Sequence, residues 1–185
     1  MAGAKLTGRL LVATPQLRDS TFDTAVILML SHDDDGSLGV MVNRPTGTPV
    51  GDLLPTWSHI ASEPGVIFEG GPVDTDSALG LVRVGGPAEP LGVRRISGQV
   101  GVVDLDTPTE VVGPAVRGMR VFAGYSGWAA GQLQDEIDEG SWYVVDAEAT
   151  DPFRIDAHGL WRTVLRRQPG ELALMASFPA DPTLN

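Results

Sequence analysis

Apolar residues recur along this chain in short runs, separated by turns rich in Gly, Pro and Asp. The run AVILML at 25–30 is uninterrupted, which predicts a strand over 24–31 that is buried on both faces. Residues 37–43 instead alternate apolar and smaller positions, which predicts a half-buried return strand. Because Asp35-Gly36 stands between these two runs, we expect a hairpin with a two-residue turn and a positive φ at Gly36.

The same reading predicts more strands than helices. Strands are expected at 8–13, 66–69, 78–84, 93–96, 100–105, 119–124 and 142–146. Helical segments are expected at 50–61 (interrupted by Pro55), 108–116, 127–139, 158–167 and 173–178, with a loop at 85–91 and a tail at 179–185. Most connections are as short as hairpin loops, so we expect one α+β domain over 1–185 with an antiparallel-rich sheet and a few packed helices.

Composition narrows the functional classes. The chain has 185 residues, 13 Lys or Arg, 24 Asp or Glu and a formal net charge of −11. This charge disfavours direct nucleic-acid binding, because a polyanion is repelled at long range. The absence of cysteine excludes disulfides and thiolate chemistry. No apolar run is long enough for a signal peptide or a membrane span, so we expect a cytoplasmic protein without membrane contact.

The most informative local motif is Gly124-Tyr125-Ser126-Gly127-Trp128. An expected strand enters it and an expected helix leaves it, which resembles a nucleophile elbow except that Trp128 replaces the final Gly. As a nucleophile, Ser126 would need a base such as His158 and an acid such as Asp146 or Asp151. The structural alternative is that Ser126 caps the helix at 127–139, and a third reading is an anion site at that helix N-terminus.

Polar residues at strand ends form a second candidate site. Asn43 and Arg44 follow one expected strand, and Glu69, Gly70 and Gly71 end another. With Tyr125 and Ser126 they are expected to line one ligand-binding cleft: Asn43, Arg44, Glu69, Gly70, Gly71, Tyr125 and Ser126. An ion pair between Arg44 and Glu69 is the structural alternative.

No metal or cofactor site is predicted. Nothing in the sequence brings His32, His59 and His158 together. The acidic turn at 33–36 does not fit a calcium loop, because Val42 stands where that loop needs Glu. His32 is instead expected to bond a nearby Asp carboxylate.

The charges at the end of the expected 127–139 helix also lead to a prediction. Acidic side chains crowd its last turns, where the helix dipole favours cations. We therefore expect Arg162, Arg166 or Arg167 to approach a carboxylate of this group, which comprises Asp135, Glu136, Asp138 and Glu139. The alternative is an acidic docking surface.

Several segments together resemble the AlgH/YqgE family of bacterial proteins. They are GRLLVATP at 8–15, VMVNRP at 40–45, GGPV at 70–73 and GYSGW at 124–128 followed by Gly131-Gln132-Leu133. The resemblance covers nearly the whole chain and implies a single α+β domain with a barrel-like core. It implies no reaction, because the family has no established one. The family name comes from a proposed role in regulating alginate synthesis.

Three functional hypotheses remain. The first is a domain, monomeric or weakly dimeric, that binds a small ligand or a partner protein. The second is a transcriptional regulator that acts without contacting DNA. The third is a hydrolase that uses Ser126.

Overall fold

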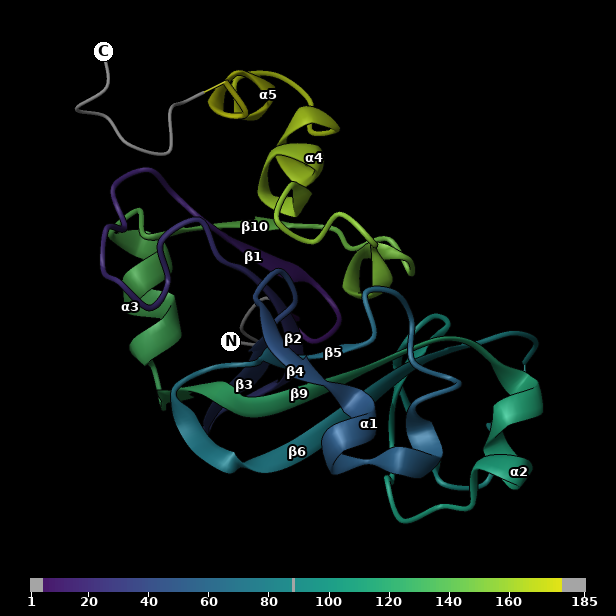
Figure 1. The fold of residues 1–185 in the computed structure, drawn as a ribbon. Coiled ribbons are helices and arrows are strands. Elements are labelled where there is room, and N and C mark those ends of the chain that lie inside the picture. The colour runs from purple at the N-terminus through teal and green to yellow at the C-terminus, as the bar shows by residue number, and fades with distance from the viewer. Residues whose placement is uncertain (1–4, 88, 178–185) are drawn as a thin grey trace.

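One curled sheet, mostly antiparallel, forms a half-barrel in the computed structural model, which describes residues 5–87 and 89–177 (Figure 1). Its main strand order is β10-β1-β2-β3-β9-β6-β8-β7, and β5 pairs with β9 and with β4. The strands are β1 (Leu10–Ala13), β2 (Val26–Asp33), β3 (Gly36–Met41), β4 (Pro45–Pro49), β5 (Val66–Glu69), β6 (Val73–Val84), β7 (Val93–Ser97), β8 (Val100–Val103), β9 (Val116–Ala129) and β10 (Trp142–Val145).

Within the described residues, five short α-helices and three 3₁₀ turns complete this single α+β domain. The α-helices are α1 (Val50–Leu53), α2 (Thr109–Val112), α3 (Gln132–Asp138), α4 (Leu160–Arg166) and α5 (Leu172–Met175). The 3₁₀ turns are η1 (Pro55–Trp57), η2 (Gly113–Ala115) and η3 (Asp151–Phe153). In Figure 1, α4 and α5 lie beyond β10 and β1 at one end of the molecule, whereas α1 and α2 lie at the other. Residues 178–185, which include the expected tail, lie outside the described residues.

The predicted hairpin is confirmed as β2 and β3, which pair antiparallel from Ile27–Met41 to Asp33–Gly36. The turn prediction was wrong by one residue, because Gly36 is the first residue of β3 and the turn is Asp34-Asp35. The φ of Gly36 is nevertheless positive, at 146°. A Cβ there would lie 2.5 Å from the carbonyl oxygen of Trp128, so the close approach of β9 requires glycine.

The longest strand, β9, organises the sheet. Its first part pairs with β6, its last part pairs with β3 from Ser126 to Ala129, and Phe122 and Ala123 pair in parallel with β5. The helix predicted at 127–139 is therefore wrong in its first part, since α3 begins only at Gln132. Burial alternates at 126–129, which is the period of a strand.

The core consists of three apolar clusters. In one of them α4 packs on the sheet, and the Trp161 indole donates a 2.8 Å hydrogen bond to the Ala13 carbonyl. A second, rich in aromatic residues, lies under α3, and a third lies beside η1 around the buried Trp57.

The expected contact between the arginines of α4 and the acidic helix was wrong. Arg167 pairs instead with buried Asp151, at 2.5 and 2.8 Å, and with Glu148 at 3.2 Å. The hydrogen bond to Asp151 raises the pKa of the Arg167 guanidinium. Arg162 donates to the carbonyl of Ala176. The loop between β10 and α4 thus supplies the carboxylates, so these pairs hold the C-terminal part together.

Candidate functional site

Several of the residues expected to line a cleft contact one another, mostly through the backbone, where β9 changes partner from β6 to β3. The Gly70 amide donates to the Ala123 carbonyl at 2.8 Å, and the Glu69 amide donates to the Arg44 carbonyl, also at 2.8 Å. A Cβ on Gly71 would overlap the backbone of Tyr125. The two glycines therefore let the 70–71 backbone cross β9 at close range.

Ser126 is fully buried at this crossing, and its hydroxyl donates a 3.1 Å hydrogen bond to the Gly70 carbonyl. It lies inside β9, so the expectation that it caps a helix was wrong, and neither a nucleophile elbow nor a helix N-terminus exists there. Of the expected triad partners, Asp151 is held by Arg167 and His158 is exposed. Among the described residues no histidine bonds Ser126, which is the geometry of a structural hydroxyl.

The polar residues beside the crossing also bond to the chain itself. Asn43 is buried, accepts from the Val26 amide at 3.0 Å and donates to the Thr24 carbonyl at 2.9 Å. Arg44 donates to the carbonyls of Thr21 and Asp23, so it secures the loop before β2. Within the described chain Arg44 forms no ion pair with the exposed Glu69. That these seven residues line a ligand cleft stays a prediction.

His32 is bonded, but not to an Asp carboxylate. Its Nδ1 lies 2.6 Å from the Ser37 hydroxyl across the β2–β3 hairpin, so the expected carboxylate contact was wrong.

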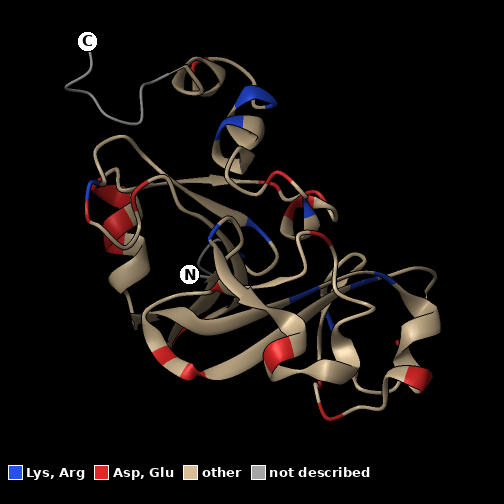
Figure 2. Cartoon of the chain, viewed as in Figure 1, with Lys and Arg blue, Asp and Glu red and all other residues tan. Residues whose placement is uncertain are grey.

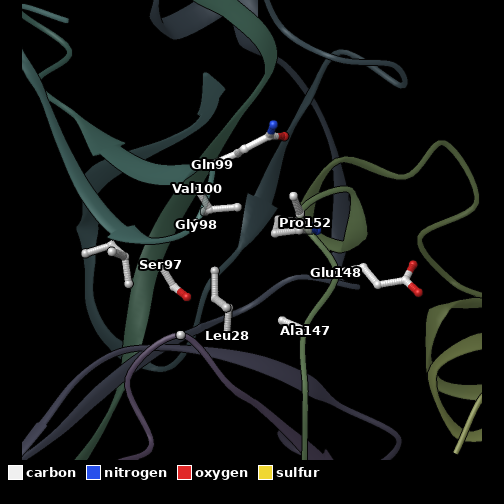
Figure 3. A pocket seen from close by; sticks show the side chains of 11 residues that line it. Leu28, Ser97, Gly98, Gln99, Val100, Ala147, Glu148 and Pro152 are labelled. Carbon is white, nitrogen blue, oxygen red and sulfur yellow. The ribbon is translucent and has the colours of Figure 1, made fainter. Parts of the chain in front are cut away.

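A small cavity lies between the β7–β8 turn and the segment that connects β10 to η3 (Figure 3). Its volume is about 100 Å³, and Leu28, Val100 and Pro152 provide much of its lining. In Figure 3 the Glu148 carboxylate points away from Leu28, in agreement with its ion pair to Arg167. The space is well below the 300 Å³ at which ligand pockets typically begin, so it suits packing better than binding.

A larger cavity, which we call the arginine cavity, opens between β6, β9 and the segment after η3. Its volume is about 420 Å³, and three arginines line it, Arg83, Arg117 and Arg154. The remaining lining residues are Ser62, Thr150, Phe153, Ile155 and Asp156. No ion pair of the described residues uses any of the three arginines.

The hydrogen bonds within the protein use only some of the guanidinium N–H donors of these arginines. Arg83 donates to the Gln99 side chain at 3.2 Å, and Arg117 donates to the Pro114 carbonyl at 3.0 Å. Since a guanidinium carries five N–H donors, most remain available to a ligand. The one lining carboxylate, Asp156, accepts from the Gly159 amide at 3.0 Å.

A fourth guanidinium lies behind the cavity. Arg120 is 1% exposed and stacks on the Phe68 ring, 4.2 Å from its centroid. It donates to the backbone carbonyls of Pro152, Arg154, Ser62 and Glu63, and no carboxylate in the described chain pairs with it. Burial lowers the pKa of Arg120 to about 10, so it stays charged at neutral pH. This uncompensated charge makes the wall of the arginine cavity more positive.

Sequence reasoning missed the arginine cavity. Arg83 lies on β6, Arg117 on β9 and Arg154 just after η3, so no short spacing in the sequence links them. The one local signal is that arginines stand among apolar residues in the last part of β6 and the first part of β9, and only the β6–β9 register brings Arg83 close to Arg117.

Two further kinds of feature, a metal site and a membrane-spanning helix, are absent from the described residues. No group of three or more His, Cys, Asp or Glu among the described residues has a geometry that could hold a metal ion. Within the same part of the chain, no helix is both long and apolar enough to cross a bilayer.

The protein is therefore an α+β domain built on a curled, mostly antiparallel half-barrel, with a buried serine where the strands cross. The family model described as AlgH-like matches residues 10–173, and the chain belongs to this family. UPF0301 proteins of Streptomyces coelicolor and Thermobifida fusca are 55% and 49% identical to it, over 98% and 97% of this chain and 96% of each relative.

Two solved structures are similar to this one. A protein of Corynebacterium diphtheriae superposes with a TM-score of 0.87 at 29% identity, over 96% of this chain and 95% of that one. The AlgH protein of Pseudomonas aeruginosa superposes with a TM-score of 0.70 at 23% identity, over 97% of both chains, and shows the shared fold. The family expected from the sequence motifs is thus confirmed.

Proposed function

We propose that this protein binds a small organic anion in the arginine cavity. The observation that carries the proposal is the convergence of Arg83, Arg117 and Arg154 on one cavity of about 420 Å³, with no ion pair to a carboxylate in the described chain. Guanidinium groups suit carboxylates and phosphates, because their planar donors match two oxygens at once.

The surroundings favour an organic anion over a bare inorganic one. Phe153 and Ile155 contribute apolar surface beside the guanidinium groups, and the cavity falls within the size range of small-molecule sites. Arg120 adds a fixed charge behind the wall. A ligand with one or two anionic groups on an apolar or planar body would therefore use both kinds of surface.

Calorimetric titration at low ionic strength tests the proposal, with inorganic phosphate, pyrophosphate, citrate and adenosine monophosphate as probes. We expect one-to-one binding of at least one organic probe. Arg117→Gln and Arg154→Gln should each weaken it about tenfold, since a hydrogen bond to a charged group contributes about 1.5 kcal/mol or more.

Arg94→Gln is the matched control, because Arg94 is exposed on β7 and does not line the cavity. If Arg94→Gln weakened binding of the probe as much as the cavity variants do, the effect would come from net charge alone, which would contradict the proposal. No binding of any probe at about 1 mM would also contradict it. Tyr125→Phe and Glu69→Gln test the predicted cleft, and loss of binding in these variants alone would place the ligand there instead.

A further inference from the structure

The sheet carries a second hollow region, on the side of α1. Two adjoining cavities of about 440 Å³ each share Leu54 and Ala78, and we call them together the groove. Ile67 and Val121 line one part, and Leu105 lines the other. Leu53, at the end of α1, is 65% exposed at its edge. Ile67 and Val121 are buried, so the aliphatic surface that the described chain leaves open to solvent comes from Leu53 and the half-buried Leu54 and Leu105.

The groove and the arginine cavity lie on opposite faces of the sheet. Arg120 and Val121 are successive residues of β9, so their side chains point to opposite sides. Arg120 reaches the carbonyls of Pro152 and Arg154 beside the arginine cavity, whereas Val121 lines the groove. An occupant of one site would not block the other.

The rim of the groove is acidic. Asp76 lines one cavity, Asp104 and Asp106 line the other, and neither cavity is lined by Lys or Arg. Asp52 on α1 is exposed nearby. None of these four carboxylates takes part in an ion pair of the described residues. Figure 2 shows acidic positions on α1 and at the bend of β6 along this edge of the molecule.

We propose that the groove binds an amphipathic, basic segment of a partner protein. Aliphatic side chains of that segment would enter the two hollows and cover Leu53, while its Lys or Arg side chains would face Asp76, Asp104 and Asp106. Charge complementarity selects this occupant, because an acidic rim around an apolar floor repels acidic segments and attracts basic ones. A second copy of this chain fits less well, since each copy has a net charge of −11.

The test starts from random peptides of about 12 residues displayed on phage and selected on the folded full-length protein, a length that spans about three helical turns. We expect the enriched peptides to combine a net positive charge with aliphatic or aromatic residues. The best of them, made with a fluorescent label, should bind the wild type in an anisotropy titration, and added salt should weaken its binding.

Two variants place that binding on the groove. Leu53→Asp and the triple variant D76N/D104N/D106N should each weaken it about tenfold or more. Asn keeps the Oδ1 atom through which Asp104 accepts from the Asp106 amide, so the loop is expected to keep its shape. The charge-matched control D34N/D135N/E139Q changes three exposed acids elsewhere and should alter binding less than twofold.

Three outcomes would overturn the proposal. The first is enrichment of neutral or acidic peptides, or of none. The second is equal weakening by both triple variants, which would mean attraction to net charge alone. The third is a dimer in sedimentation that Leu53→Asp dissociates, which would make the groove an interface between two copies.

Discussion

Two tryptophans of one buried cluster, Trp128 and Trp142, differ in whether the indole N–H has a hydrogen-bond acceptor. Trp128 and Trp142 are 7% and 4% exposed, and their rings meet edge to face with centroids 6.2 Å apart. The Trp128 indole donates a 2.7 Å hydrogen bond to the Glu136 carboxylate, which ties β9 to α3. The Trp142 indole N–H finds no acceptor within the described residues. The two indoles are thus similarly buried, but only the Trp128 N–H has a hydrogen-bond acceptor among the described residues.

This difference predicts unequal costs for the same substitution. Trp128→Phe should lower the free energy of unfolding by about 1.5 kcal/mol more than Trp142→Phe, because only the first breaks a hydrogen bond to a charged acceptor. Urea unfolding followed by circular dichroism measures both, and Glu136→Gln serves as the control that keeps an acceptor oxygen. Equal costs for the two Phe variants would show that the Trp128–Glu136 bond contributes little.

At the scale of elements, short-range sequence patterns predicted most strands. They failed where pairing between residues distant in sequence determines the secondary structure. The apolar run of β2 and the turn after it identify a hairpin, because both signals lie within the hairpin itself. Around Ser126 the helical spacing of Ala130, Leu133 and Ile137 extended the predicted helix too far towards the N-terminus. The pairing of Gly39 with Ser126 keeps this stretch in β9, and no local pattern reveals it.

The candidate sites follow the same rule. Several of the residues expected at one cleft do meet, because strand ends and glycines mark a crossing that the sequence shows. The arginine cavity was not predicted, because its arginines come from β6, β9 and the segment after η3. The chain has twelve arginines, and the pairing of β6 with β9, together with the position of the segment after η3, brings three of them to one cavity.

The corrected position of Ser126 leads to a prediction about elements. Ser126→Ala should cost about 1 kcal/mol by removing the hydrogen bond to the Gly70 carbonyl, without loosening α3 selectively. Gly131→Ala should loosen α3 itself, because Gly131 precedes that helix with a φ of 79°. Amide hydrogen exchange separates the two effects at the Asp135 and Glu139 amides, which donate within the helix. Selective loss of their protection in Ser126→Ala would restore the capping role.

At the scale of the whole molecule, basic side chains fasten the C-terminal part to the sheet. Arg167 pairs with Asp151 and Glu148 after β10, and Arg120 donates to the carbonyls of Pro152 within η3 and Arg154 just after it. Arg120 also holds the loop before β5 through the carbonyls of Ser62 and Glu63. Three parts of the chain that are distant in sequence therefore converge on one guanidinium.

This convergence makes Arg120 the most consequential charge for stability. Arg120→Met should lower the free energy of unfolding by about 3 kcal/mol, because it leaves buried carbonyl oxygens without donors. Arg120→Lys should cost nearly as much, since an ammonium on one stem cannot reach the positions that a planar fork serves. Arg94→Gln on the exposed face of β7 is the control and should change stability by less than about 0.5 kcal/mol.

The lowered pKa of Arg120 fixes the pH range over which that cost is constant. The folded-state pKa is about 10, below the ordinary value for an arginine, so the unfolded chain binds more protons at this group only between the folded-state value and the ordinary one. The contribution of Arg120 to stability therefore rises with pH in that window and is flat below it. Urea unfolding of the wild type and Arg120→Met at pH 6, 7 and 8 should give the same difference each time. A difference that changed steadily across this range would mean that another titrating group couples to Arg120.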